Sequence, residues 1–169
     1  WAVGIVDAPY LWDGAKLSST LPKAVWDLKV HDSCIDHNQL GLLALGWGLA
    51  NYRFGRYRDN AKTTLNQLIC PQTVPVSWLN GLLTGTYLCR DLINLPSNHL
   101  TPAEVETAAR RLAATHQATI TTYEGDQLAA AFPAIHTVGR AAEIGPRLID
   151  MRWGDSGPKI TLVGKGITF

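Results

Sequence analysis

The chain has 169 residues, of which 46% are hydrophobic and 17% charged, and its formal net charge at pH 7 is +1. This composition supports a folded core and argues against intrinsic disorder. Lysine and arginine form no basic run, which argues against a nucleic-acid partner. The longest apolar run, residues 40–50, is too short for a membrane-spanning helix of about 20 residues. We therefore expect neither nucleic acid nor a membrane as a partner.

The three cysteines, Cys34, Cys70 and Cys89, are far apart in the sequence. Their odd number and wide spacing predict free thiols in a reducing compartment. The expected location is therefore the cytoplasm.

The N-terminal third predicts short elements separated by turns. Residues 7–16 contain a proline and an Asp-Gly pair, which are turn signals. Residues 26–30 alternate apolar and charged side chains, as in a half-buried strand. Asp36 or Asn38 is expected to cap a helix over residues 39–53, whose glycines Gly46 and Gly48 allow close packing against another element. Residues 65–69 predict a further strand.

The remaining residues alternate helix and strand signals. Ser77 is expected to cap a helix over residues 78–94. The sequence Thr101-Pro102-Ala103-Glu104 combines an N-cap, a proline at the first helical position and a reciprocal glutamate, so a second helix should run to His116. Further patterns predict a strand at 118–123, a helix at 125–131, and strands at 147–153 and 160–163, the last two paired as an antiparallel hairpin. The resulting fold class is α/β, with a mixed β-sheet flanked by helices.

Lys165 stands between Gly164 and Gly166 at the end of the predicted strand 160–163. Because the two glycines lack Cβ atoms, the backbone can turn there and approach a ligand closely. The residues leave several roles open: phosphate binding, although the segment lacks the spacing of a P-loop; an amine for Schiff-base or general-base chemistry; a metal ligand in its neutral form; or an ordinary surface lysine. Burial and a nearby divalent cation both favour a neutral amine.

Other polar residues favour structural roles. The segment from His31 through Cys34 to His37 has zinc-type ligands, but it lacks a clear second pair, which favours a polar helix entry. Asp150 is expected to be a sheet-face or paired carboxylate, Asp155 a turn residue, and His99 and His136 hydrogen-bonded loop side chains. Arg90 and Asp91 are expected to form caps or ion pairs on their own helix.

Four segments, in order, resemble the leucine (cytosol) aminopeptidase family: residues 90–102 (RDLINLPSNHLTP), 132–140 (FPAIHTVGR), 147–155 (RLIDMRWGD) and 163–169 (VGKGITF). The resemblance implies a dinuclear metal-dependent exopeptidase that releases N-terminal amino acids, with a leucine-type preference, from peptide substrates. It also implies two divalent ions, Mn²⁺ or Zn²⁺, whose bound water attacks the peptide bond, and a homohexamer. Leu95 and Ser97 depart from the usual threonine and alanine of the family.

The resemblance assigns one metal ligand to this chain, Lys165, and no catalytic residue. In the family, the segment after Lys165 continues into Asp-[Ser/Thr]-Gly-Gly, and further ligands follow, so we expect this chain to be inactive alone. The implied domains are a shortened α/β N-terminal domain at 1–62, a linker at 63–76 and the start of a zinc-exopeptidase-like catalytic domain at 77–169. The alternative is a non-catalytic interaction or regulatory module that uses the surface around residues 40–57.

Overall fold

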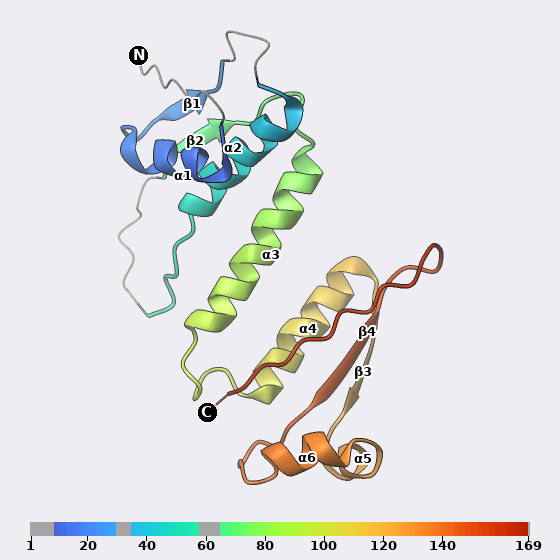
Figure 1. The fold of residues 1–169 in the computed structure, drawn as a ribbon. Helices are drawn as coiled ribbons and strands as arrows, with labels where there is room; N and C mark the ends of the chain where they lie inside the picture. The colour runs from blue at the N-terminus through green and yellow to red at the C-terminus, as the bar shows by residue number, and fades with distance from the viewer. Residues whose placement is uncertain (1–8, 30–34, 58–64, 169) are drawn as a thin grey trace. The chain divides into compact units, whose positions relative to one another are not determined.

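The computed structural model describes residues 9–29, 35–57 and 65–168. The chain divides into two compact units, Trp1–Asn94 (unit 1) and Leu95–Phe169 (unit 2). The α/β class is confirmed, since helices and strands occur in both units (Figure 1). Among the described residues, each unit contains its own small, two-stranded sheet. The predicted linker at residues 63–76 stays a prediction.

Unit 1 combines three helices with a small parallel sheet. Its elements in chain order are α1 (Leu11–Thr20), β1 (Val25–Asp27), α2 (His37–Ala50), β2 (Gln67–Ile69) and α3 (Val76–Asn94). Strands β1 and β2 pair in parallel, with Trp26 opposite Leu68. The predicted strands at 26–30 and 65–69 are therefore present but shorter, and Val30 lies outside the described residues.

Helices α1 and α2 pack closely at two glycines, Gly14 of α1 and Gly46 of α2, where there is no room for a side chain. A Cβ atom on Gly46 of α2 would lie 1.8 Å from the carbonyl oxygen of Leu11, and one on Gly14 of α1 would lie 2.0 Å from that of Leu43. Gly46 therefore does permit close packing, as predicted. The predicted turn at residues 7–16 is wrong for its second half, because the Asp-Gly pair lies inside α1. The contact with α2 favours a helical conformation for the Asp-Gly pair, and the local sequence carries no signal for this contact.

The core of unit 1 lies between α2, the loop after β2 and the start of α3. Its buried apolar side chains are Leu40, Ala44, Val74 and Leu79. Of the two predicted caps, Asp36 is the one that caps α2, accepting a hydrogen bond from the backbone N–H of Gln39 at 2.7 Å. Helix α3 begins at Val76, directly after Pro75. The prediction that Ser77 is the N-cap is therefore wrong, since Ser77 lies within the first turn.

A buried asparagine connects distant parts of unit 1. Asn66 is 1% exposed, and its side-chain amide donates to the carbonyl oxygens of Ser18 and Leu21 at 2.8 and 3.0 Å. Its side-chain oxygen accepts from the backbone N–H of Ala24 at 2.9 Å, and its backbone carbonyl accepts from the indole N–H of Trp47 at 3.1 Å. A buried polar group is tolerated when its hydrogen bonds are satisfied, as they are here.

Unit 2 contains α4 (Pro102–His116), β3 (Thr119–Tyr123), α5 (Gly125–Ala131), α6 (Pro133–Gly139) and β4 (Leu148–Arg152). The capping box of α4 is confirmed: the Thr101 hydroxyl accepts from the N–H of Ala103 at 3.2 Å, and the Glu104 carboxylate accepts from the N–H of Thr101 at 2.8 Å. Gln117, with φ of 55°, ends the helix in the left-handed region. Helix α6 was not predicted, so His136 lies in a helix rather than in a loop.

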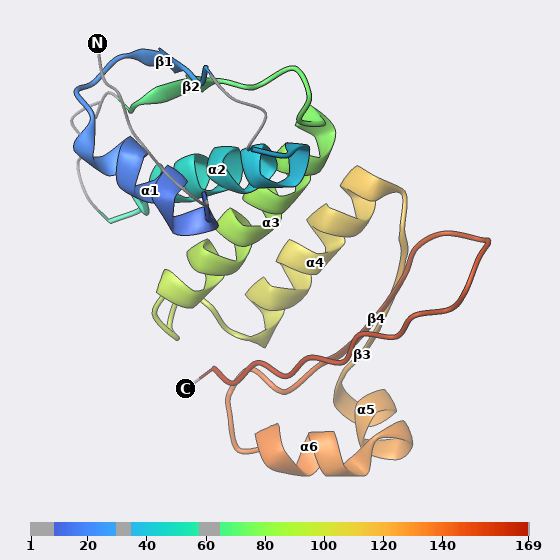
Figure 2. The same ribbon diagram turned by 45° about the horizontal axis from the view of Figure 1, so that its top comes forward.

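The expected hairpin of residues 147–153 and 160–163 is wrong. Strand β4 lies beside β3 (Figure 2) and pairs with it in antiparallel register, with Thr121 opposite Asp150. Residues 160–163 have no regular structure, and Ile160, Leu162 and Val163 are 81%, 92% and 93% exposed. An apolar run forms a strand only when a neighbouring strand pairs with its backbone, and no described residue pairs with this one.

No described helix is both long enough and apolar enough to cross a membrane.

Candidate functional site

The segment that carries Lys165 follows a glycine-rich turn at the end of β4. Gly154 and Gly157 adopt positive φ angles of 82° and 89°, which favour glycine because it has no Cβ atom. The chain then continues without regular structure to Thr168. Lys165 is exposed, and no ion pair joins it to another residue of the described ranges.

The glycines beside Lys165 are not required by the conformation of this chain. Neither Gly164 nor Gly166 has a positive φ, and a Cβ atom on either would meet no heavy atom within 4 Å. The sharp turn expected at Lys165 is therefore absent from the described structure. The two glycines leave the backbone on both sides of the amine uncovered.

The described residues do not by themselves form a metal centre. Among them, no three histidine, cysteine, aspartate or glutamate side chains lie close enough together to hold an ion. A divalent ion needs several such ligands, so a single lysine does not suffice. Of the zinc-type segment, His31 and Cys34 lie outside the described residues, and His37 begins α2.

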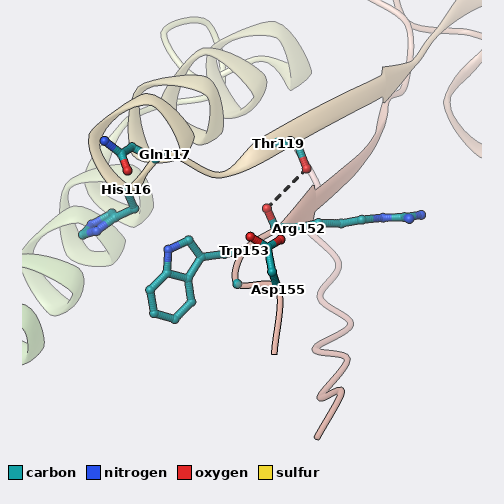
Figure 3. Close-up of a pocket in the computed structure, with 7 residues that line it drawn as sticks. His116, Gln117, Thr119, Arg152, Trp153 and Asp155 are labelled. Atoms are coloured by element: carbon teal, nitrogen blue, oxygen red, sulfur yellow. Dashed lines mark hydrogen bonds between the residues drawn. The ribbon is translucent and has the colours of Figure 1, made fainter. Parts of the chain in front are cut away.

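A shallow pocket of about 390 Å³ lies in unit 2, where α4 ends and β4 leaves the sheet. Figure 3 shows that its side chains do not converge: the Arg152 side chain extends away from His116 and Trp153. Arg152 instead pairs with Asp150 at 2.8 Å, which confirms Asp150 as a paired carboxylate, and the hydrogen bonds from Arg152 hold the pKa of that carboxyl below its usual range. Lys165 is not among the lining residues, which are His116, Gln117, Thr119, Arg152, Trp153, Gly154 and Asp155.

An ion-pair network centred on Arg147 holds the start of β4 in place. Its guanidinium lies 2.6 Å from a Glu106 carboxylate oxygen of α4 and 2.7 Å from one of Glu124, which precedes α5. Arg110 also pairs with Glu106, at 2.6 Å. Burial raises the pKa of Glu106, but hydrogen bonds from Arg110 and Thr122, with the charges of Arg110 and Arg147, lower it on balance. The network joins three elements of unit 2 ahead of the segment that carries Lys165.

In unit 1, the first part of the stretch proposed for the alternative interaction module, residues 40–47, is largely internal. Leu40, Leu43, Ala44 and Trp47 are all buried. What remains accessible includes one side of a groove of about 510 Å³, where the start of α2 faces Trp78. Residues 40–47 therefore offer a partner little surface outside this groove.

Arg90 and Asp91 were expected to form caps or ion pairs on their own helix. The structure instead directs both toward the end of α2, where Arg90 donates to the carbonyl oxygen of Leu49 at 3.0 Å and Asp91 accepts from the hydroxyl of Tyr52 at 2.7 Å. Tyr52 was not predicted as an important residue. Its partners lie about 40 positions away, a separation at which local periodicity carries no signal.

The chain is therefore an α/β protein with two units, and the second unit carries a glycine-flanked lysine after its last strand. Two family profiles match it. The profile described as "M17 aminopeptidase, N-terminal domain" matches residues 2–71, and that described as "Cytosol aminopeptidase family, catalytic domain" matches residues 87–169.

Individual proteins that resemble this chain are also cytosol aminopeptidases. A probable cytosol aminopeptidase of Geobacter sp. (strain M21) is 33% identical over 92% of this chain and 33% of its own length. The crystal structure of a cytosol aminopeptidase from Coxiella burnetii superposes with a TM-score of 0.81 at 36% identity, covering 90% of this chain and 33% of that one. The enzyme BotP in complex with Mn, at 23% identity, has a TM-score of 0.69 over 83% of this chain and 32% of its own, which supports the fold alone.

This chain belongs to the cytosol (leucine) aminopeptidase family, M17. It spans about a third of the length of the curated relatives that it matches, and it includes parts of both family domains.

Proposed function

We propose that the intact protein is a metal-dependent aminopeptidase that removes N-terminal residues, with a leucine-type preference, from peptides. The observation that carries this proposal is the match of both family domains in their usual order, at residues 2–71 and 87–169. The structural similarity to the Coxiella burnetii enzyme at 36% identity supports it. Peptide substrates, a cytoplasmic location and assembly as a homohexamer are parts of the same proposal.

The role we propose for Lys165 is to bind one of two divalent ions, Mn²⁺ or Zn²⁺, through its neutral amine. The support is its place in the family sequence, the exposure of its side chain and the absence of any described residue that covers Gly164 or Gly166. Since the described residues supply no further group of metal ligands, the other ligands are proposed to come from elsewhere in the intact protein.

The test is to replace Lys165 with alanine in the intact protein and to measure bound metal and hydrolysis of leucine p-nitroanilide. We expect Lys165→Ala to lower occupancy at one of the two metal sites and to lower the rate. Lys159→Ala is the matched control, because Lys159 is an exposed lysine of the same segment without the flanking glycines. Unchanged metal content and rate in Lys165→Ala would remove the ligand role.

A second measurement concerns the 169-residue chain alone. With one proposed ligand and no catalytic residue, it should bind manganese weakly and leave leucine p-nitroanilide intact. Robust turnover by the purified chain would contradict the assignment of ligands.

A further inference from the structure

The C-terminal end of α2 is held by residues of α3. The last carbonyl groups of a helix have no partner within the helix itself. Here the Tyr87 hydroxyl donates to the carbonyl oxygen of Gly48, and Arg90 donates to that of Leu49 at 3.0 Å. The positive charge of Arg90 is favourable at this end of α2, where the helix dipole is negative.

Tyr52, two residues beyond α2, is the centre of this contact. Its hydroxyl donates to the carboxylate of Asp91 at 2.7 Å and accepts from the side-chain amide of Asn94 at 3.0 Å. Its ring centroid lies 5.3 Å from the ring of Tyr87 and 5.3 Å from the guanidinium carbon of Arg90. We call these five residues, Tyr52, Tyr87, Arg90, Asp91 and Asn94, the Tyr52 clasp.

The clasp lies where the boundary of the family profile differs from the boundary between the two structural units. The catalytic-domain profile begins at residue 87, yet unit 1 extends to Asn94. The first eight matched residues, Tyr87 to Asn94, are therefore in unit 1. Four of them bind the end of α2 or the side chain beyond it, and Asn94 is the last residue of both α3 and unit 1.

We propose that Tyr52, Asp91 and Asn94 are positioning residues, which fix the last turn of α3 so that the chain leaves unit 1 from a rigid point. Each contact is partly exposed and modest alone, but several converge on one side chain. Contacts that share a side chain couple, so losing the Tyr52 hydroxyl removes two hydrogen bonds together.

The test is hydrogen exchange of the intact protein, well below its unfolding temperature. Tyr52→Phe removes the hydroxyl but keeps the ring contacts, and it should accelerate exchange of amides at 91–95 roughly fivefold, the effect of losing about 1 kcal/mol of local hydrogen bonding. Asn94→Ala should have a smaller effect at the same amides. Asp91→Asn keeps an oxygen that accepts from Tyr52 and should stay close to wild type.

The matched control is Trp47→Phe, which removes the hydrogen bond from the indole N–H to the Asn66 carbonyl and destabilises unit 1 away from the clasp. A positioning role predicts faster exchange at 91–95 in Tyr52→Phe but not in Trp47→Phe. Equal acceleration in both variants, or none in Tyr52→Phe, would overturn the proposal.

A second test measures the kinetics of the intact enzyme and therefore rests on the proposed aminopeptidase function. In the intact enzyme, Tyr52→Phe should lower kcat about two- to fivefold with metal content and KM unchanged, and Asp91→Asn should not. If exchange at 91–95 accelerates while kcat stays at the wild-type value, the clasp is structural only and the positioning role is wrong. If the wild-type enzyme itself hydrolyses no peptide, the proposed function fails, and the exchange measurement still decides whether the clasp fixes α3.

Discussion

The two units reach a folded state by different means. Among the described residues, unit 1 buries six hydrophobic side chains, Leu40, Leu43, Ala44, Trp47, Val74 and Leu79, whereas unit 2 buries two, Ala113 and Leu128. Unit 1 brings its helices together through glycines and connects them with a satisfied buried asparagine. Unit 2 depends on one strand pair, a capping box and an ion-pair network.

The difference shows why similar apolar patterns have different outcomes. Leu40 and Leu43 are buried because α1 and α3 lie against α2. Leu162 and Val163 also belong to an apolar run, but no described element covers them, and they are 92% and 93% exposed. Burial is therefore a property of the neighbours of a segment as much as of its own side chains.

The largest expected effect is on the close helix crossing of unit 1. Gly46→Ala should destabilise unit 1 by about 3 kcal/mol, at the upper end for overpacking, because its Cβ atom would lie 1.8 Å from the Leu11 carbonyl oxygen. Chemical denaturation followed by tryptophan fluorescence measures this change. Gly85→Ala in α3 is the control: a Cβ atom there meets nothing within 4 Å, so the better helix propensity of alanine should raise stability slightly. Equal effects of the two variants would contradict the role of the crossing.

A second prediction compares two leucines of unit 2. Leu128 is 0% exposed and Leu162 is 92% exposed. Leu128→Ala should cost about 2–3 kcal/mol through lost burial and a residual cavity, whereas Leu162→Ala should change stability by less than about 0.5 kcal/mol. Thermal unfolding of both variants of the 169-residue chain provides the measurement. A large loss in Leu162→Ala would show that residues 160–163 are covered, which would remove the contrast between the units.

The smallest expected effects concern the capping box of α4. Thr101→Ala should cost about 1 kcal/mol, the usual value of an N-cap. Thr107→Ala is the control, because its hydroxyl donates to a carbonyl of the same helix, that of Ala103 at 2.9 Å, and does not cap a helix end. The melting temperatures of the two variants should differ in that direction, and a loss in Thr107→Ala as large as that in Thr101→Ala would contradict the capping role.

The same box predicts a dependence on pH. Hydrogen bonds from the Thr101 side chain and backbone hold the pKa of Glu104 below its ordinary value of 4.5. A pKa that is lower in the folded state stabilises the fold above the ordinary value, and this contribution disappears as the pH falls through the folded value. Glu104→Gln should therefore flatten the loss of stability below about pH 4.5. An acid limb that is identical in the variant and in wild type would exclude this contribution.

Local sequence signals were sufficient where an element is specified by its own residues. Asp36, one of the two predicted caps of α2, and the capping box of α4 were confirmed, because each depends on side chains within a few positions of one another. The helix at 125–131 was also confirmed with its predicted bounds. Helix α6 was not predicted, because a proline directly after a helical pattern usually marks its end, whereas Pro133 is the first residue of the next helix. The family was also identified from sequence, through the order of four short segments.

Tertiary structure decided what depends on partners distant in the sequence. It placed the Asp-Gly pair inside α1, where Gly14 lies against α2, and it paired β4 with β3. In the part of the chain that the structure describes, it left residues 160–163 without a strand partner. It also brought Tyr52 to Asp91 and Asn94 across about 40 residues of chain. The physical reason is that capping and turn preferences are set by adjacent residues, whereas strand pairing, helix crossing and burial are set by whichever surfaces the folded chain brings together.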